Sequence, residues 1–519
     1  MDTQSAPHSP DGAAGGLTAA WLPRALTALV LAGAAFCALV FITHGVRLVL
    51  FPFDIDNSEG VLLYQGVRLA QGQFLYSPLD AFPYLVDNYP PVYPLFLAAV
   101  FWLTGPVFWW PRLLSLVATL LTAVLLGAWI RRRTGEWAAA WLGGLAYLLF
   151  YHVYDWGALG RVDALGVLFA VSGLWVFARW GRWQGAVPLF LLALFTRQTL
   201  FAAPLAVFFT LWQGKENHGA REAGPAVALR FLLTLGVLGA LGLGLLMLGT
   251  GGRAWSHLVT YNANTYRWFD VWLYTRHWFW LYPLWGLVPV AVLLTLGRTG
   301  SPGEKTRGGL LFWYTLLALG EALLCGKIGS APNYLLSLVC ATVVGLGDFH
   351  TLAQRAGARW RTGMKSLPLT GFLLASLVQL WINGNWMWHI AKAPSEQEKS
   401  AGLYVQRILQ NETQPVLADL AGLPLLAGHP PVFEPFICSQ LAREGVWDQE
   451  VLICRIEATE FGLVLLRFDL EQPWDIERYT PEMITALRTQ YRLQRRIGPY
   501  FLYSPKNGQG MLDRTETTP

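Results

Sequence analysis

The sequence contains few charged residues and few cysteines for its length. Lys, Arg, Asp and Glu make up 14% of its 519 residues, and a formal net charge of +5 gives no indication of nucleic-acid binding. The five cysteines include no Cys-x-x-Cys pair, which argues against a zinc or redox motif. Cys438 and Cys454 could form a disulfide in an oxidising exterior, and two separate thiols explain them nearly as well.

The N-terminal segment lacks the features of a cleaved signal peptide. Residues 1–16 are rich in Ser, Pro, Gly and Ala, with no basic region and no clear cleavage site. We therefore expect residues 1–24 to form a disordered cytoplasmic tail. The first apolar segment is then retained as a membrane helix.

Apolar residues, in contrast, are abundant. Hydrophobic residues make up 54% of the chain, which includes 25 Trp, and this exceeds the content of an ordinary soluble domain. Trp suits the headgroup level of a bilayer, where its apolar ring and polar edge are both accommodated. The composition predicts a polytopic membrane protein.

Apolar runs of about 20 residues, the length that crosses a bilayer, recur along residues 25–389. They predict a mainly α, polytopic helical membrane domain with about 9–11 transmembrane helices. The expected spans are residues 25–43, 113–130, 137–154, 164–178, 231–252, 278–297, 308–326, 328–347 and 366–388, with two shorter helices within 183–213. Residues 91–104 are short for a span and are predicted to lie along the outer surface.

Basic residues predict which side each loop faces. Arg131, Arg132 and Arg133 directly follow a span, and such residues stay on the cytoplasmic side of the plasma membrane. Alternation places the loop 47–112 outside the cell, together with residues 390–504. These later residues have a strand-like pattern at 462–468 and a helix-like pattern at 481–491, as in a small extracytoplasmic α/β domain. Residues 505–519 are predicted to be a flexible tail.

One apolar stretch is interrupted by a charge at Thr196-Arg197-Gln198. Both ends of the stretch 183–213 are predicted to be cytoplasmic, so its turn should reach the outer half of the membrane. Broken helices persist in lipid only where protein or a polar cavity surrounds them. A guanidinium there needs an anion or carbonyl partner, which makes a phosphate site the leading interpretation of Arg197.

Three carboxylates follow the first span, at Asp54, Asp56 and Glu59. Their pattern alone fits a solvated helix end as well as a site that uses charge at the boundary between lipid and water. On a short helix Asp56 and Glu59 share a face. There they could hold one substrate hydroxyl or one divalent cation, Mg²⁺ or Mn²⁺.

Further polar residues are predicted on the same outer side. A carboxylate could accept a proton from an attacking hydroxyl, while Arg or Lys stabilises a leaving phosphate. Each residue also has a structural alternative. Arg161 and Asp163 could form a simple interfacial ion pair, Lys327 could extend to lipid headgroups, and Tyr89 could begin a rigid turn.

Several motifs resemble those of a known superfamily. They are Tyr64–Gly72, Tyr76, Tyr89–Pro94, Arg112, Gly160–Leu165, Phe195–Gln198 and Gly326–Tyr334. Their order resembles that of the C-type (GT-C) glycosyltransferases, and in particular the bacterial members related to protein O-mannosyltransferases and aminoarabinose transferases. The resemblance covers residues 25–388 and is strongest before Thr199.

The resemblance implies a sugar donor on a polyprenyl phosphate, a membrane lipid, and a glycan, lipid or protein acceptor on the extracytoplasmic side. It also implies that an acid of the first external loop is the general base. Relatives commonly have an adjacent Asp-Glu pair there, whereas Asn57 and Ser58 separate the acids here. We favour Asp56 as the base, keep Asp54 as the close alternative, and give Glu59 a supporting role. The remaining predicted site residues are Arg197, Lys327 and Arg161 for the donor phosphate and Asp163, Asp87, Tyr89, Asn333 and Tyr334 for the acceptor pocket.

A polytopic transporter or lipid-sugar flippase without transferase activity is the alternative. In that interpretation Arg197 and Glu321 would line a path across the membrane. Internal repeats are not apparent, and the predicted polar residues gather at one surface. Both observations favour the enzyme.

Overall fold

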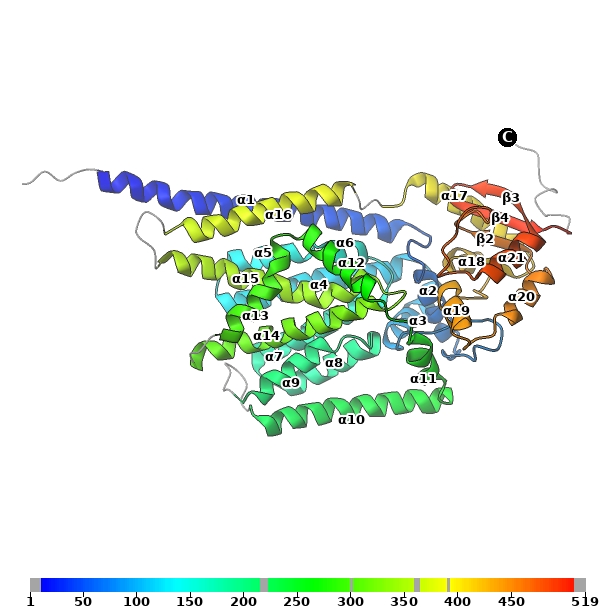
Figure 1. The fold of residues 1–519 in the computed structure, drawn as a ribbon, viewed down its shortest axis with the longest axis horizontal. Coiled ribbons are helices and arrows are strands. Elements are labelled where there is room, and N and C mark those ends of the chain that lie inside the picture. The colour runs from blue at the N-terminus through cyan, green and yellow to red at the C-terminus, as the bar shows by residue number, and fades with distance from the viewer. Residues whose placement is uncertain (1–10, 215–222, 299–301, 359–364, 390–392, 508–519) are drawn as a thin grey trace, which may run out of the picture.

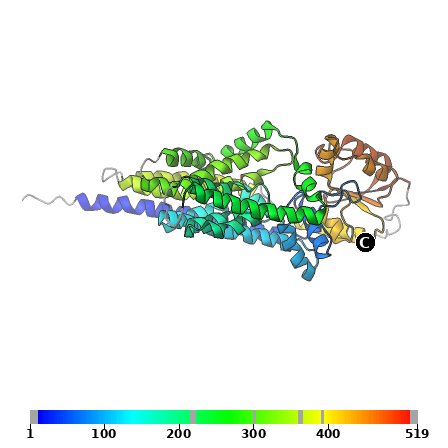
Figure 2. The same cartoon turned by 90° about the horizontal axis from the view of Figure 1, so that it is seen from below.

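The computed structural model describes residues 11–214, 223–298, 302–358, 365–389 and 393–507. Within these ranges, a bundle of long helices carries a smaller unit with a β-sheet at one end (Figure 1). The view turned by 90° shows the same two parts in line along the long axis (Figure 2). Residues 508–519 of the predicted tail, and residues 1–10, lie outside the described residues.

Seven helices among the described residues are long and apolar enough to cross a membrane. They are α1 (Asp11–Leu50), α4 (Trp109–Thr134), α7 (Val162–Trp180), α10 (Pro225–Thr250), α14 (Pro302–Ala322), α15 (Leu336–Ala358) and α16 (Leu367–His389). The prediction of a polytopic helical membrane protein is confirmed. Helix α1 already begins at Asp11, so helix replaces the irregular chain predicted for residues 11–24.

Shorter helices complete the bundle. They are α5 (Trp137–Tyr147), α6 (Tyr151–Trp156), α8 (Trp183–Thr196), α9 (Ala202–Trp212), α12 (Trp268–Leu281) and α13 (Val288–Arg298). The predicted break at Arg197 is present between α8 and α9.

Two spans predicted as continuous, 137–154 and 278–297, are instead each built from two short helices. Pro283 follows the end of α12 and cannot donate the next helical hydrogen bond. The predicted span 328–347 also starts late. Its first residues form a loop and the 3₁₀ turn η4 (Pro332–Leu335) before α15.

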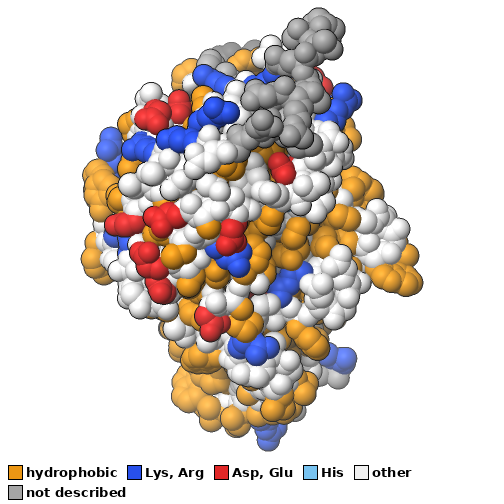
Figure 3. Space-filling view, turned by 90° about the vertical axis from the view of Figure 1, so that its right-hand side faces the viewer, with side chains coloured by type: hydrophobic (Ala, Val, Ile, Leu, Met, Phe, Trp, Pro, Cys, Tyr) orange, Lys and Arg blue, Asp and Glu red, His pale blue; other side chains and the backbone are white. Residues whose placement is uncertain are grey.

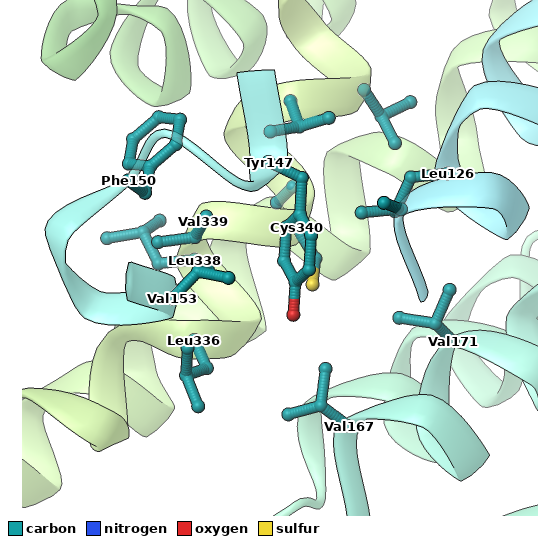
Figure 4. Close-up of a cluster of buried hydrophobic side chains, with 14 of the residues drawn as sticks. Leu126, Tyr147, Phe150, Val153, Val167, Val171, Leu336, Leu338, Val339 and Cys340 are labelled. Atoms are coloured by element: carbon teal, nitrogen blue, oxygen red, sulfur yellow. The ribbon is translucent and has the colours of Figure 1, made fainter. Parts of the chain in front are cut away.

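The core of the bundle is apolar and draws on several helices. Tyr147 of α5 and Cys340 of α15 lie at its centre, surrounded by side chains such as Leu126 of α4 and Val171 of α7 (Figure 4). All four are buried. This packing fixes the ends of α4, α7 and α15, on which the polar residues described below are placed.

The loop between α1 and α4 contains α2 (Glu59–Ala70) and α3 (Val92–Thr104), which pack on each other. Helix α3 coincides with the short surface helix predicted at 91–104. Three smaller elements follow later in the chain: α11 (Arg253–Leu258) and the 3₁₀ turns η1 (Thr260–Asn262) and η3 (Leu323–Gly326). A further 3₁₀ turn, η2 (Trp285–Leu287), precedes α13.

The C-terminal unit is a four-stranded sheet with helices around it. Strand order is β1-β2-β4-β3, with β1 and β2 parallel and the other pairs antiparallel. The elements are α17 (Glu396–Gln410), β1 (Val416–Ala418), α18 (Gly422–Leu426), α19 (Pro435–Arg443), α20 (Glu450–Glu457), β2 (Leu463–Leu466), α21 (Pro481–Gln490), β3 (Tyr491–Ile497) and β4 (Tyr500–Pro505). Ser395 and Glu398 form a capping box at the start of α17. Seen end-on, this unit exposes acidic and basic side chains side by side (Figure 3).

The first loop and the C-terminal unit are packed together. Phe51 and Phe53 share an apolar cluster with Val405 and Leu423. The backbone of Tyr84 donates to Val432 and accepts from Glu434, at 2.9 and 3.1 Å. The C-terminal unit is therefore held against the loop that carries the acidic motif. Cys438 is buried and Cys454 exposed, and both are free thiols.

Candidate active site

Glu59 and Arg112 form a buried ion pair beneath the first loop. Two nitrogens of Arg112 donate to the two carboxylate oxygens of Glu59, at 2.9 and 2.7 Å, and both side chains are 0% exposed. The backbone N–H groups of Ile55 and Gly160 also donate to Glu59, at 2.9 and 2.6 Å. Burial alone would raise the pKa of Glu59, but the Arg112 charge and these hydrogen bonds hold it below its ordinary value. Glu59 thus fixes the loop.

Asp54 connects the same loop to the C-terminal unit. Its carboxylate accepts the backbone N–H groups of Gly422 and Leu423, at 3.0 and 2.9 Å, and the residue is only 2% exposed. Burial, reinforced by the negative charge of Glu59, raises the pKa of Asp54 to about 7. Asp54 does not line the cavity described below.

Asp56 has a different environment from both neighbours. Its side chain is 22% exposed, and it forms an ion pair with Arg161 at the start of α7. Its Oδ1 also accepts the backbone N–H of Ser58 at 3.0 Å. Asp56 lines a cavity of about 290 Å³ between the bundle and the C-terminal unit. Of the three acids that directly follow the first span, it is the one that lines this space.

Asp163 holds two arginines behind the cavity wall. Its carboxylate pairs with Arg161 and Arg197, and it accepts the side-chain amide of Asn333 at 2.9 Å. Arg197 lies over the ring of Tyr334, 4.4 Å from its centroid. The carboxylate of Asp163 therefore connects three segments: the break between α8 and α9, the start of α7 and the loop before α15.

Tyr89 and Lys327 complete the polar wall. Arg161 donates to the Tyr89 hydroxyl at 3.0 Å. Lys327 Nζ donates to Asn262 Oδ1 at 2.7 Å, and among the described residues no carboxylate lies within salt-bridge distance of it. Burial and the charge of Arg197 lower the pKa of Lys327 to about 8. Lys327 is thus a cation in the wall without an acidic partner among those residues.

The cavity brings together seven of the predicted site residues, and leaves four outside its lining. Those that line it are Asp56, Tyr89, Arg161, Arg197, Lys327, Asn333 and Tyr334. Those that do not are Asp54, Glu59, Asp87 and Asp163. Asp87 is buried elsewhere, where it pairs with Arg68 at 3.2 Å and accepts the backbone N–H of Tyr76 at 2.6 Å.

The C-terminal unit also contributes to the cavity, which the sequence did not predict. Glu434, Phe436, Ile437, Asp475 and Arg478 line it from that side. Arg478 is paired with Asp419 at 2.7 Å. Nothing in the local pattern of residues 434–478 marks them as cavity residues, since only the packing of the unit on the loop brings them there.

Asp56 and Glu59 do not fit the predicted cation site. Arg112, Ile55 and Gly160 already use both oxygens of Glu59, so this carboxylate has no free edge to share with Asp56. Over the ranges that the structure describes, no group of three or more His, Cys, Asp or Glu side chains could hold a metal ion.

Comparisons with known proteins agree with this architecture. A family model described as dolichyl-phosphate-mannose-protein mannosyltransferase matches residues 88–239. No curated protein matches the chain.

Solved structures share the fold across nearly the whole chain. The crystal structure of ArnT from Cupriavidus metallidurans bound to undecaprenyl phosphate is 14% identical, with a TM-score of 0.53, covering 92% of this chain and 98% of that one. The apo form of the same protein is 13% identical, with the same TM-score and coverage. The Archaeoglobus fulgidus oligosaccharyltransferase, in complex with Zn and sulfate, is 12% identical with a TM-score of 0.51, covering 91% of this chain and 73% of that one.

Two independent findings thus agree: a mannosyltransferase family model matches the segment that carries Tyr89, Arg161 and Arg197, and the fold is that of known glycosyltransferases. The chain is a multi-pass membrane protein with the fold of the C-type glycosyltransferases, and its residues 88–239 match a mannosyltransferase family model.

Proposed function

We propose that this enzyme transfers a sugar from a polyprenyl-phosphate donor to an acceptor on the extracytoplasmic side, with Asp56 as general base. The observation that carries the proposal is the cavity, whose wall contains a carboxylate and a cation without an acidic partner among the described residues. ArnT, which shares the fold, was solved with undecaprenyl phosphate, a lipid of the class required.

The proposed reaction uses the carboxylate and the cations of the cavity wall in different roles. The acceptor O–H attacks the anomeric carbon while Asp56 takes its proton, and the bond from that carbon to the phosphate oxygen breaks. The electron pair leaves with the polyprenyl phosphate, whose growing negative charge is stabilised by Lys327 and, next to it, Arg197. Attack opposite the leaving group inverts the anomeric centre.

Asp56 is preferred to Asp54 because of the partners of each carboxylate. Both oxygens of Asp54 are occupied by N–H groups of α18, and its side chain is nearly inaccessible. Asp56 is held by Arg161 yet still reaches the cavity.

Residues of the C-terminal unit form the opposite side of the cavity, where we place the acceptor. Glu434, Asp475 and Arg478 supply both charge signs there, which suits a hydroxyl-rich acceptor. A glycan, a lipid headgroup or a protein side chain would all present such groups. Arg131, Arg132 and Arg133 at the opposite end of α4 support this orientation, because basic residues favour the cytoplasmic side of a membrane.

The direct test is release of polyprenyl phosphate by the purified full-length protein in lipid nanodiscs. Polyprenyl-phosphate sugars with different headgroups are supplied with a mixed envelope extract as acceptor, and both the released lipid phosphate and the labelled product are measured. We expect the two to form in equal amounts. Movement of the sugar lipid across sealed vesicles with neither product would contradict the proposal and favour a flippase.

A further inference from the structure

A second cavity lies at the other end of the bundle, between α4, α5 and α7. Its volume is about 790 Å³, and its wall is mostly apolar, with Leu120, Val124, Leu145 and Leu148 among the lining residues. It reaches Arg132, 20 residues after Arg112 along α4. At 1.5 Å per residue, this end lies about 30 Å from the Glu59–Arg112 pair. We call it the α4–α5 groove.

Close packing of two helices shapes this groove. A Cβ atom on Gly144 of α5 would lie 3.0 Å from the carbonyl oxygen of Ala123, and one on Gly127 of α4 would lie 3.1 Å from that of Ala140. The two backbones therefore approach closely. Helix α5 has only 11 residues, about 16 Å, and is too short to cover α4 across a hydrocarbon core of about 30 Å.

Three arginines stand at one end of the groove. Arg131, Arg132 and Arg179 all line it, and no Asp or Glu among the described residues does. Arg132 Nε donates to the carbonyl of Ala178, next to Arg179, at 3.0 Å, so the two guanidinium groups are neighbours. Among the described residues none of the three forms a salt bridge with a carboxylate, whereas adjacent Arg133 pairs with Asp348.

Three tryptophans line the groove together with these arginines. Arg131 lies 4.9 Å from the centroid of the Trp137 ring, and Trp141 and Trp175 also line the groove. Trp and Arg together are typical of the headgroup region of a bilayer. The apolar part of the groove thus extends from the headgroup level into the hydrocarbon.

We propose that the α4–α5 groove binds an anionic phospholipid of the surrounding membrane, with its phosphate at the three arginines and an acyl chain along the apolar wall. Charge complementarity carries the assignment, because a cluster of cations without acidic partners next to an apolar groove matches an anionic headgroup above a chain. A helix of a partner protein would instead cover the arginines with hydrocarbon surface, which is unfavourable. The site does not depend on the proposed transfer reaction.

The test compares lipids that differ only in headgroup charge. The full-length protein is exchanged from detergent into mixtures of phosphatidylglycerol and phosphatidylethanolamine with identical chains, and bound lipid is counted by native mass spectrometry. Replacing Arg131, Arg132 and Arg179 together by Gln should weaken phosphatidylglycerol binding by about fivefold per arginine, roughly a hundredfold in total. Arg355→Gln, which removes an exposed arginine of α15, is the matched control and should bind as wild type.

A second variant tests the apolar wall separately. Ala128→Trp places a large ring in the groove while leaving the arginines in place. It should reduce binding of both lipids, with the melting temperature and glycosyl transfer unchanged. Equal retention of the two lipids by the wild type, or unchanged phosphatidylglycerol binding by the triple variant, would overturn the proposal. A second copy of the chain bound in place of lipid would do the same.

Discussion

The underside of the first loop and the wall of the cavity differ in how their carboxylates are used. Beneath the loop, Glu59 and Asp54 are buried and fully bonded to Arg112 and to backbone N–H groups of α18. In the wall, Asp56 is partly exposed and has one arginine partner. The three acids lie within six residues of sequence. Partners that are remote in sequence, and not the neighbouring residues, therefore decide which of these carboxylates is accessible to a substrate.

The largest expected effect distinguishes Asp56 from Asp54. We expect Asp56→Asn to lower the turnover rate by about 10²–10⁴-fold, the usual contribution of a general base, with an unchanged melting temperature. Asp54→Asn should retain most of the activity, since that side chain does not line the cavity. Asp80→Asn, an exposed acid of the same loop, is the control. Loss of activity in Asp54→Asn, with activity retained in Asp56→Asn, would contradict the assignment of Asp56 as the base.

The next effect concerns the buried pair. Glu59→Gln leaves the Arg112 charge without its partner in a site with no solvent access. Breaking such a pair should lower the free energy of unfolding by about 3–5 kcal/mol, measured by thermal unfolding in detergent. Glu482→Gln, at an exposed position of α21, should leave it unchanged. A stable but inactive Glu59→Gln would instead assign Glu59 a direct role in the reaction.

A smaller effect is expected at Lys327. Loss of a charge-assisted hydrogen bond to the donor phosphate, worth about 1.5–3 kcal/mol, should raise the KM for donor roughly 10–100-fold in Lys327→Gln. Because its pKa is about 8, the wild-type lysine loses its proton as the pH rises above that value, and kcat/KM should fall. Lys327→Arg keeps its charge and should show no such fall. A pH profile identical in all three proteins would exclude Lys327 from phosphate binding.

A further effect is a pH dependence of stability at Asp54. Its pKa is raised from 3.8 to about 7 in the folded protein, so the folded state holds this proton more tightly than the unfolded state. The neutral acid therefore favours folding below about pH 4, and this advantage is lost as the pH rises to about 7. The melting temperature of wild type relative to Asp54→Asn should decline across this window. A constant difference would contradict the assigned environment.

Much of the fold could be predicted because burial in a membrane follows local composition. Apolar length identified most spans, and the interruption at Arg197 identified the break between α8 and α9. The breaks within 137–154 and 278–297 were missed, because hydropathy does not report where a helix ends, although Pro283 marks the break in the second segment. The sheet of the C-terminal unit was anticipated from the pattern at 462–468, where β2 lies.

The sequence predicted which residues belong to the candidate site better than it predicted how those residues are arranged. Seven of the predicted residues do line one cavity, because residues at helix ends on the same side of a bundle lie at one level. The cavity residues from 434–478 were missed. They come from a unit whose position depends on contacts such as Phe53 with Leu423 and Tyr84 with Val432.

By itself, the sequence determined the class of protein and the level at which its polar residues lie, because the hydrophobic effect acts on every apolar run regardless of its partners. Only the tertiary structure decided which carboxylate is buried and which is accessible. Asp54, Asp56 and Glu59 have the same chemistry, and their partners at residues 422, 161 and 112 are remote in sequence. Electrostatic environment depends on distance in space, and folding alone sets those distances.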